Sequence, residues 1–280
     1  MNVMKASEMQ EKLLHSLKLS ENDILSQWNN PIGSDTRHFF VDNLLPDDFV
    51  NEVFDAFPSD GIGFVRQQSF REKKRTLAQF SKLESTIQQI FELITIVFQT
   101  PEVISAIGDV LSIQDLEGDP SLYAGGASMM FEGDFLNPHI DNSHDANRVK
   151  YRRLNLLFYV SPDWKFENGG NFELWDNKVA FPKTIISKFN RLVVMETNKQ
   201  SFHSVSPVLT NKPRCCISNY YFQQESPYGE EYFHVTSFTG RPNELVKRVF
   251  CKIDNLARNI ISNTLKIGRG KNQMNKYTKK

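Results

Sequence analysis

Cysteine, unbalanced charge and long apolar runs are all scarce in this 280-residue sequence. Each scarcity excludes a class of protein. Its three cysteines, two of them adjacent, are too few for the disulfide framework of a small secreted domain. Lys and Arg together number 33, and so do Asp and Glu. A net charge of zero argues against a nucleic-acid partner and against an anionic membrane.

Apolar segments are short throughout the chain. Charged and polar residues interrupt the first 26 residues, so we expect no secretory signal. The most apolar stretch, residues 91–98, is too short to span a bilayer. We therefore expect a reduced, soluble, cytoplasmic protein without a membrane partner. Residues 266–280 carry six basic and no acidic side chains; a solvated terminus is the more common reading and a nucleic-acid arm the alternative.

Apolar and aromatic residues are abundant in this sequence. Hydrophobic residues make up 40% of the chain and 22 residues are Phe, which predicts a large folded interior and excludes disorder. Residues 1–110 are mostly helical by apolar spacing, residues 111–240 have strand-like periodicity, and residues 241–280 form a helix and basic tail. We expect one integrated domain from these three parts.

The central part predicts a mainly β, α+β fold. Short apolar segments between about residues 113 and 238 are separated by turn signals such as Gly125-Gly126 and Asn168-Gly169-Gly170. Such a pattern is typical of two sheets that face each other, a double-stranded β-helix or jelly roll of the cupin kind. Helical patterns at residues 83–98 and 242–265 predict flanking helices.

His139, Asp141 and His203 are the strongest candidate site residues. The segment His139-Ile140-Asp141 puts an imidazole and a carboxylate two residues apart. Because side chains on an extended strand repeat every two residues, both point to the same face. Two histidines and one carboxylate on one face of a metal are the facial triad of non-haem Fe(II) sites. The sequence therefore predicts an iron site with open positions.

Arg214 is the second candidate, at the start of a segment rich in aromatic and β-prone residues. On such a strand Arg214, Cys216 and Ser218 share one face. An inward arginine beside a metal needs an anion, and its planar fork grips a carboxylate in bidentate fashion. A dicarboxylic co-substrate would chelate the metal at one end and bind Arg214 at the other. A surface arginine on an edge strand is the alternative, and the nearby triad makes it less favoured.

In these features the chain resembles the Fe(II)/2-oxoglutarate-dependent dioxygenases and, within them, the prolyl 4-hydroxylase-like branch. The resemblance covers about a third of the chain, from residue 124 to residue 222. It rests on segments in the family's order, namely 133–142, 156–160 with Asp163-Trp164, 168–174, 189–195, 203–207 and the strand that begins at Arg214. It implies iron ligands at His139, Asp141 and His203, with Arg214 on the C5 carboxylate of 2-oxoglutarate.

The resemblance also places residues around the co-substrate. Tyr159 stands where the family often has a tyrosine hydroxyl on the same carboxylate. Many relatives read Arg-x-Ser, whereas Cys216 takes the serine position here, so that contact is lost or passes to Ser218. A tyrosine that often precedes the first histidine is replaced by Met129 or Met130. Both departures concern co-substrate binding rather than the metal.

The activity that the resemblance implies is oxidative. O2 and 2-oxoglutarate would yield succinate and CO2 while an unactivated C–H bond is hydroxylated, with ascorbate as an optional reductant. Retention of Asp141 favours hydroxylation over halogenation. The polar and charged residues 142–153 favour a peptide, a sugar-containing precursor or another polar small molecule, with a prolyl substrate as one case; the turn 161–168 is a second candidate lining. The alternative is a non-catalytic or hydrolytic cupin-type metal protein, against which Arg214 and Tyr159 argue.

Several neighbours invite competing interpretations. His144 and Asp145 are adjacent and so face opposite ways on a strand, which argues against a ligand pair. His234 lacks a following strand with an inward arginine. Cys215 and Cys216 predict buried thiols, because adjacent cysteines bridge only with strain. A basic cluster either receives an anionic substrate or lines a solvated edge; it comprises Arg148, Lys150, Arg152 and Arg153.

Overall fold

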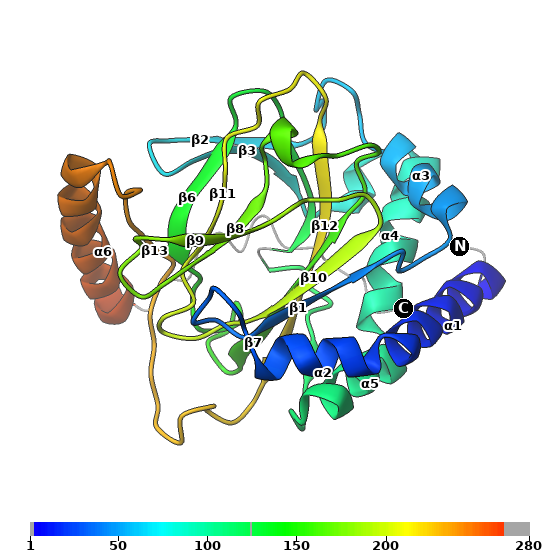
Figure 1. Cartoon of the computed structure of the whole chain (residues 1–280), viewed down its shortest axis with the longest axis horizontal. Helices are drawn as coiled ribbons and strands as arrows, with labels where there is room; N and C mark the ends of the chain where they lie inside the picture. The colour runs from blue at the N-terminus through cyan, green and yellow to red at the C-terminus, as the bar shows by residue number, and fades with distance from the viewer. Residues whose placement is uncertain (1–2, 124, 266–280) are drawn as a thin grey trace.

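A computed structural model describes residues 3–123 and 125–265 of the chain. At its centre lies one antiparallel sheet of 13 strands that curls into a half-barrel (Figure 1). The strands are β1 (His38–Asp42), β2 (Val65–Gln68), β3 (Glu72–Leu77), β4 (Glu117–Gly118), β5 (Gly126–Met130), β6 (Phe135–Ile140), β7 (Tyr151–Tyr159), β8 (Phe172–Trp175), β9 (Pro182–Ile185), β10 (Arg191–Glu196), β11 (His203–Val205), β12 (Arg214–Gln223) and β13 (Ser237–Phe238).

The strand order explains the curl. The path runs β1-β10-β7-β12-β5-β3-β6-β11-β8-β9, so strands distant in sequence are neighbours in the sheet. β7, β10 and β12 form the broad wall, and β6, β8 and β11 form the facing wall, with β3 and β5 between them. The mainly β jelly-roll fold predicted from the sequence is confirmed.

Five helices cover the outer face of the broad wall (Figure 1). They are α1 (Val3–Leu19), α2 (Glu21–Asn29), α3 (Asp47–Asp55), α4 (Ser85–Gln99) and α5 (Pro101–Leu111). α4 shows why they pack there, since its apolar residues recur at helical spacing and Phe91, Ile94 and Phe98 are buried. One apolar cluster joins these helices to the outward side chains of β7, β10 and β12.

Alternation along the broad wall separates core from site. On β12, Cys215 and Ile217 face the helices and belong to the apolar core, while Arg214, Cys216 and Ser218 face the inside of the half-barrel. The side-chain period of two fixes both sets at once. The prediction that Arg214, Cys216 and Ser218 share a face is confirmed, and all three cysteines of the chain are buried and free.

The amino-terminal region contributes more than helices. β1 pairs with β10, and β3 pairs with both β5 and β6, so strands from residues 1–110 complete the sheet. The division into residues 1–110, 111–240 and 241–280 stays a prediction. Residues 266–280, whose basic composition the sequence singled out, lie outside the described residues.

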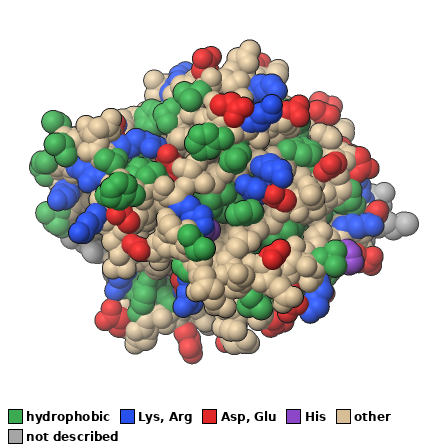
Figure 2. Space-filling model, viewed as in Figure 1, with side chains coloured by type: hydrophobic (Ala, Val, Ile, Leu, Met, Phe, Trp, Pro, Cys, Tyr) green, Lys and Arg blue, Asp and Glu red, His purple; other side chains and the backbone are tan. Residues whose placement is uncertain are grey.

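α6 (Leu245–Leu265) stands at the opposite end of the molecule from α1–α5 (Figure 1). The apolar spacing of Val249, Ile253 and Leu256 is that of a helix that buries one face. These side chains are instead 61%, 65% and 64% exposed. Figure 2 shows hydrophobic side chains gathered at this end of the molecule, with Lys and Arg side chains among them.

Among the described residues, no single helix has the length and apolar composition needed to cross a bilayer. α4 and α5 together reach that composition, with a bend of 44° between them. Both helices bury apolar side chains in the core against the sheet, including Phe98 and Ile107. Core packing accounts for their apolar character.

Candidate metal and co-substrate site

The three predicted metal ligands meet on the inner face of the facing wall. His139 is on β6, Asp141 follows that strand directly, and His203 is on β11. His139 and His203 are opposite each other in the antiparallel register of β6 and β11. One ligand atom from each of the three residues lies within 4.8 Å of the others. Register therefore brings together residues that are far apart in sequence.

Both histidines are oriented with the same ring nitrogen toward the site. Nδ1 of His139 donates to the carbonyl of Asn137 at 3.0 Å, and Nδ1 of His203 donates to the carbonyl of Ser201 at 2.9 Å. A proton fixed on Nδ1 leaves the Nε2 lone pair free for a metal. The two Nε2 atoms lie 3.6 and 3.5 Å from the Asp141 carboxylate oxygens.

The carboxylate of Asp141 is held by residues outside the triad. Asn155 donates to Oδ2 at 2.6 Å, and a guanidinium nitrogen of Arg152 lies 3.2 Å from the same oxygen. Burial would raise the pKa of Asp141, but the charge of Arg152 and the two histidines outweigh burial and hold that pKa well below its usual value. Asp141 is therefore ionised, which is the form that the predicted metal ligand requires.

His139 is kept neutral by its surroundings. Burial, and then the neighbouring His203, lower the pKa of His139 below its usual value. The ring of Phe238 on β13 stacks on His139, with centroids 5.0 Å apart and planes inclined by 18°. A neutral, sterically fixed imidazole is the form that binds a metal.

Arg214 is a buried cation without an acidic partner. Its residue exposure is 4%, and no carboxylate lies within ion-pair distance of it among residues 3–123 and 125–265. Nε donates to the Ser187 hydroxyl at 3.1 Å, and the guanidinium lies 4.8 Å from the centre of the Tyr159 ring. Buried charges are normally paired. This site thus has one positive charge to offer an anion.

The other residues predicted to bind the co-substrate differ in their contacts with Arg214 and with the cavity. Cys216 and Ser218 line the same cavity as the triad, with Sγ and Oγ 3.8 Å apart. The Tyr159 hydroxyl is buried, and it makes no hydrogen bond with the part of the chain that the structure describes. Met130, not Met129, takes the position that faces the site, where its sulfur contacts a guanidinium nitrogen of Arg214 at 3.6 Å.

Some residues that line the site were not predicted from the sequence. Asn155 and Leu157 line the cavity from β7, and Glu72, Lys74 and Thr76 line it from β3. The alternation that places Tyr159 inward also places Asn155 inward, so this signal was present. β3 carried no such signal, because its charged sequence does not alternate between apolar and polar residues.

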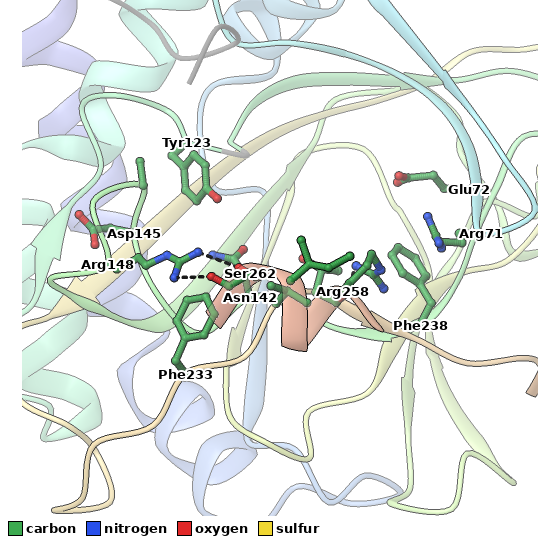
Figure 3. A pocket seen from close by; sticks show the side chains of 14 residues that line it. Arg71, Glu72, Tyr123, Asn142, Asp145, Arg148, Phe233, Phe238, Arg258 and Ser262 are labelled. Carbon is green, nitrogen blue, oxygen red and sulfur yellow. Dashed lines mark hydrogen bonds between the residues drawn. The ribbon is translucent and has the colours of Figure 1, made fainter. Parts of the chain in front are cut away.

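A larger cavity of about 330 Å³ adjoins the triad cavity (Figure 3). We call it the outer pocket. Both cavities are lined by Glu72, Tyr123, Asn142, Thr236 and Phe238, so the outer pocket adjoins the cavity that His139, Asp141 and His203 line. Its other lining residues are Arg71, Asp145, Ala146, Arg148, Phe233, Val235, Arg258, Ile261 and Ser262. Four residues of the segment 142–153 line the outer pocket, whereas the turn 161–168 lines neither cavity. That residues 142–153 contact a substrate stays a prediction.

The basic cluster predicted after Asp141 is dispersed in the structure. Arg152 is 1% exposed and pairs with Asp141. The other members have partners of their own, with Arg148 on Ser262, Lys150 on Glu117 and Arg153 on Glu196. Each of the four therefore has a partner of its own within the protein, and their role toward a substrate stays a prediction.

The competing ligands do not join the triad. His144 bonds through Nδ1 to the Ser143 hydroxyl at 2.8 Å and packs on Tyr151. Burial lowers the pKa of His234 to about 4, and its ring stacks on Tyr232. In the described part of the chain, His139, Asp141 and His203 form the single cluster with metal-binding geometry.

The donor set fits a non-haem iron. Two imidazole nitrogens and one carboxylate oxygen converge from one side, which leaves positions open for exchangeable ligands. Arg214 lies in the same cavity and supplies a fork for a carboxylate. The arrangement suits a metal and a dicarboxylate bound together.

Comparison with known proteins agrees with this chemistry. Residues 125–222 match the family described as the 2OG-Fe(II) oxygenase superfamily. Prolyl 3-hydroxylase OGFOD1 of Xenopus laevis is 33% identical over 84 residues, which cover 28% of this chain and 16% of that protein. The Mus musculus protein of the same name is 32% identical over 85 residues, or 28% and 15% of the two chains. The match thus spans less than a fifth of these relatives.

Solved structures share the fold at low identity. Prolyl 4-hydroxylase from Phytophthora capsici has a TM-score of 0.54 and 17% identity, over 91% of this chain and 78% of that one. A prolyl hydroxylase from Trichoplax adhaerens, in complex with a hypoxia inducible factor peptide, has a TM-score of 0.50 and 16% identity, over 77% of this chain and 92% of that one. HygX from Streptomyces hygroscopicus, with nickel and 2-oxoglutarate bound, has a TM-score of 0.50 and 12% identity, over 71% of this chain and 86% of that one.

Proposed function

We propose that this chain is a 2-oxoglutarate-dependent non-haem iron dioxygenase that hydroxylates an unactivated C–H bond of a polar substrate. The match of residues 125–222 to the 2OG-Fe(II) oxygenase superfamily and the cluster of His139, Asp141 and His203 support this proposal. A prolyl ring within a peptide is the first case to test. We further propose His139, Asp141 and His203 as the iron ligands and Arg214 as the residue that binds 2-oxoglutarate.

The observation that carries this proposal is the buried, acid-free environment of Arg214. The Arg214 guanidinium is 4% exposed and has no carboxylate partner in the described residues. Burying an unpaired charge costs free energy, which the carboxylate of a bound ligand would offset. Arg214 and the triad line one cavity, so a dicarboxylate can reach both. A hydrolytic or inert metal site would have no use for this cation, which disfavours the cupin-type alternative.

Each residue of the site has a distinct task in this reaction. Bound Fe(II), with 2-oxoglutarate and O2, supplies the oxidation that breaks the C–H bond and releases succinate and CO2. Arg214, held by Ser187, orients the far carboxylate of the co-substrate. Arg152 and Asn155 keep Asp141 ionised and oriented. Tyr159 packs against Arg214 and excludes water from it.

The outer pocket supports a substrate with a compact apolar ring and polar ends. Tyr123, Phe233 and Phe238 provide aromatic walls (Figure 3). Phe238 also stacks on His139. Its arginines are engaged within the protein, Arg71 with Asp254 and Arg148 with Ser262. A prolyl ring presents apolar C–H bonds to such walls while its peptide groups remain polar. The name of the OGFOD1 relatives favours this case.

Succinate production tests the proposal. Purified protein with Fe(II), 2-oxoglutarate and air is offered proline-containing peptides, free amino acids and glycan precursors, and succinate above the uncoupled background is measured. We expect one class to raise succinate together with an equal amount of hydroxylated product. The Asp141→Ala variant should give none. Absence of turnover with Fe(II) and all classes, in protein that binds 2-oxoglutarate, would exclude the proposed substrates.

We also propose a cytoplasmic location. All three cysteines of the chain are free thiols and all are buried, as expected in a reducing compartment.

A further inference from the structure

α6 is attached to the protein by its polar side. Polar side chains along this side bond to the body of the protein, including Asp254 with Arg71, Asn255 with the backbone of Phe238, Arg258 with the carbonyl of Thr236, Asn259 with the amide of Val235, and Arg248 with the carbonyl of Val179. The helix is thereby held in a defined orientation. An ordinary surface helix packs the other way, with its apolar side inward.

The opposite side of α6 is apolar and faces solvent. We call it the α6 apolar face, and it comprises Leu245, Val246, Val249, Ile253, Leu256 and Ile260; at its edge Phe250 packs on Phe70 and Ile261 lines the outer pocket. Every one of these side chains is more than half exposed, and Val246 reaches 85%. An apolar stripe along one long helix is larger than the isolated apolar residues normal on a surface. It indicates a contact with something outside this chain.

The charge beside the α6 apolar face has one sign. Lys252 is exposed on the helix, whereas the acidic residues nearby are engaged, Glu244 with Lys247 and Asp254 with Arg258. The chain continues for 15 residues past Leu265, and these contain six Lys and Arg and no acidic residue. An apolar helix face joined to a basic segment is complementary to an anionic lipid surface.

We propose that α6 docks the protein on an anionic membrane surface, lying in the plane of the interface with the α6 apolar face among the acyl chains and the following basic residues at the lipid phosphates. Such binding needs two signals, apolar burial and basic charge, and the carboxyl end of this chain has both. The expectation of no membrane partner rested on the balanced net charge and on the lack of a spanning segment. A helix that lies in the plane of the interface is compatible with both.

A second copy of the chain is the competing occupant. Val246, Val249, Ile253, Leu256 and Ile260 have the alternating three- and four-residue spacing of a helix pair. The positions that flank this spacing include Phe250 and Ala257, where helix pairs usually carry charges that fix the partner. A second α6 would bring another exposed Lys252, and the acidic residue of this helix, Asp254, is engaged with Arg258. These observations favour the membrane.

Vesicle sedimentation tests the docking surface. Full-length protein is mixed with vesicles of phosphatidylcholine alone or of equimolar phosphatidylcholine and phosphatidylglycerol. We expect sedimentation with the mixed vesicles and its loss at high salt. The double variant Ile253→Ser/Leu256→Ser should partition at least about tenfold less, since two aliphatic side chains are withdrawn from lipid. The control Phe181→Ser/Leu209→Ser, at residues 79% and 68% exposed elsewhere, should sediment like the wild type.

Light scattering after size-exclusion chromatography distinguishes the competing occupant, and thermal unfolding shows that each variant is folded. A wild-type dimer that Ile253→Ser/Leu256→Ser converts to a monomer would overturn the proposal. So would wild-type protein that stays in solution with both vesicle types, or a double variant that sediments unchanged.

Discussion

At the scale of single residues, the site is built around two buried arginines with opposite needs. The charge of Arg152 is balanced within the protein, because Arg152 forms an ion pair with Asp141, donates to Asn142 Oδ1 and has the ring of Tyr220 4.1 Å from its guanidinium carbon. Arg214 contacts a hydroxyl, a sulfur and an aromatic face, and among the described residues it has no acidic partner. Arg152 therefore balances the charge of Asp141, whereas Arg214 has the charge to bind the carboxylate of the proposed co-substrate.

Replacing Arg214 should weaken co-substrate binding selectively. We expect Arg214→Ala to reduce affinity for 2-oxoglutarate by more than about 2 kcal/mol, because the far carboxylate loses a desolvated partner. Arg214→Lys should recover part of it, since a point charge replaces a fork. Calorimetric titration of the Mn(II)-loaded protein without O2 measures this. The exposed Arg66→Ala is the control, and equal affinities for Arg214→Ala and Arg66→Ala would show that another residue holds the carboxylate.

Replacing Arg152 should act on the metal ligand and on stability. Arg152→Ala leaves the largely buried carboxylate of Asp141 without its cation, which should lower the free energy of unfolding by about 3 kcal/mol. Lys188→Ala, which removes an exposed pair with Asp42, should cost less than about 1 kcal/mol. Urea denaturation of the metal-free proteins provides both values.

The same comparison can separate positioning from packing. Arg152→Ala/Asp141→Ala should be destabilised by less than the sum of the two single substitutions, because no unpaired charge remains. Metal affinity of Arg152→Ala should fall as well. Additive stability losses with unchanged metal affinity would mean that Arg152 contributes packing alone.

At the scale of elements, strand register and one glycine turn set the geometry. Register pairs His139 on β6 with His203 on β11, so both histidines reach the proposed metal site from strands. Gly170 precedes β8 with φ near +60°, and its backbone approaches Arg214 so closely that a Cβ would lie 2.9 Å from Arg214 Cδ. Glycine is required there for conformation and for space.

Gly170→Ala should therefore weaken 2-oxoglutarate binding, by about tenfold, because the methyl group displaces the Arg214 fork from its carboxylate. Gly229→Ala is a matched control, since Gly229 also has positive φ (+69°) but has nothing within 4 Å of a Cβ. Both variants should lose about 1 kcal/mol of stability from backbone strain. Equal 2-oxoglutarate affinity in the two, measured by the same calorimetry, would refute the close-approach argument.

Elements differed in how far the sequence predicted them. α4 and β12 follow from apolar periodicity, and the inward set on β12 follows from its period of two. β3 did not, because Glu72–Leu77 is a charged segment that becomes a strand by closing the sheet between β5 and β6. α6 was predicted as a helix, yet its apolar face points outward, since polar contacts with Arg71 and Arg148 hold the other side. Periodicity identifies a face but not what covers it.

At the scale of the whole molecule, the stabilising core and the site lie on opposite faces of one sheet. Apolar side chains from α1 through α5 pack on the outside of β7, β10 and β12, and the ligands lie within the half-barrel. This separation is why the triad was predictable from three residues while the outer pocket was not: the pocket is assembled from β3, the loop after β6, the segment before β13 and α6. No local pattern encodes such an assembly.

The same separation lets a ligand be removed without removing the fold, and iron binding tests the central claim most directly. Anaerobic Fe(II) titration of metal-free protein, with bound iron counted per chain, should give one tightly bound iron for the wild type. Asp141→Ala should bind none tightly while its circular dichroism spectrum stays that of the wild type, because folding energy comes from the apolar core rather than the ligands. A folded Asp141→Ala protein that retains wild-type iron content would contradict the assignment of His139, Asp141 and His203 as the metal site.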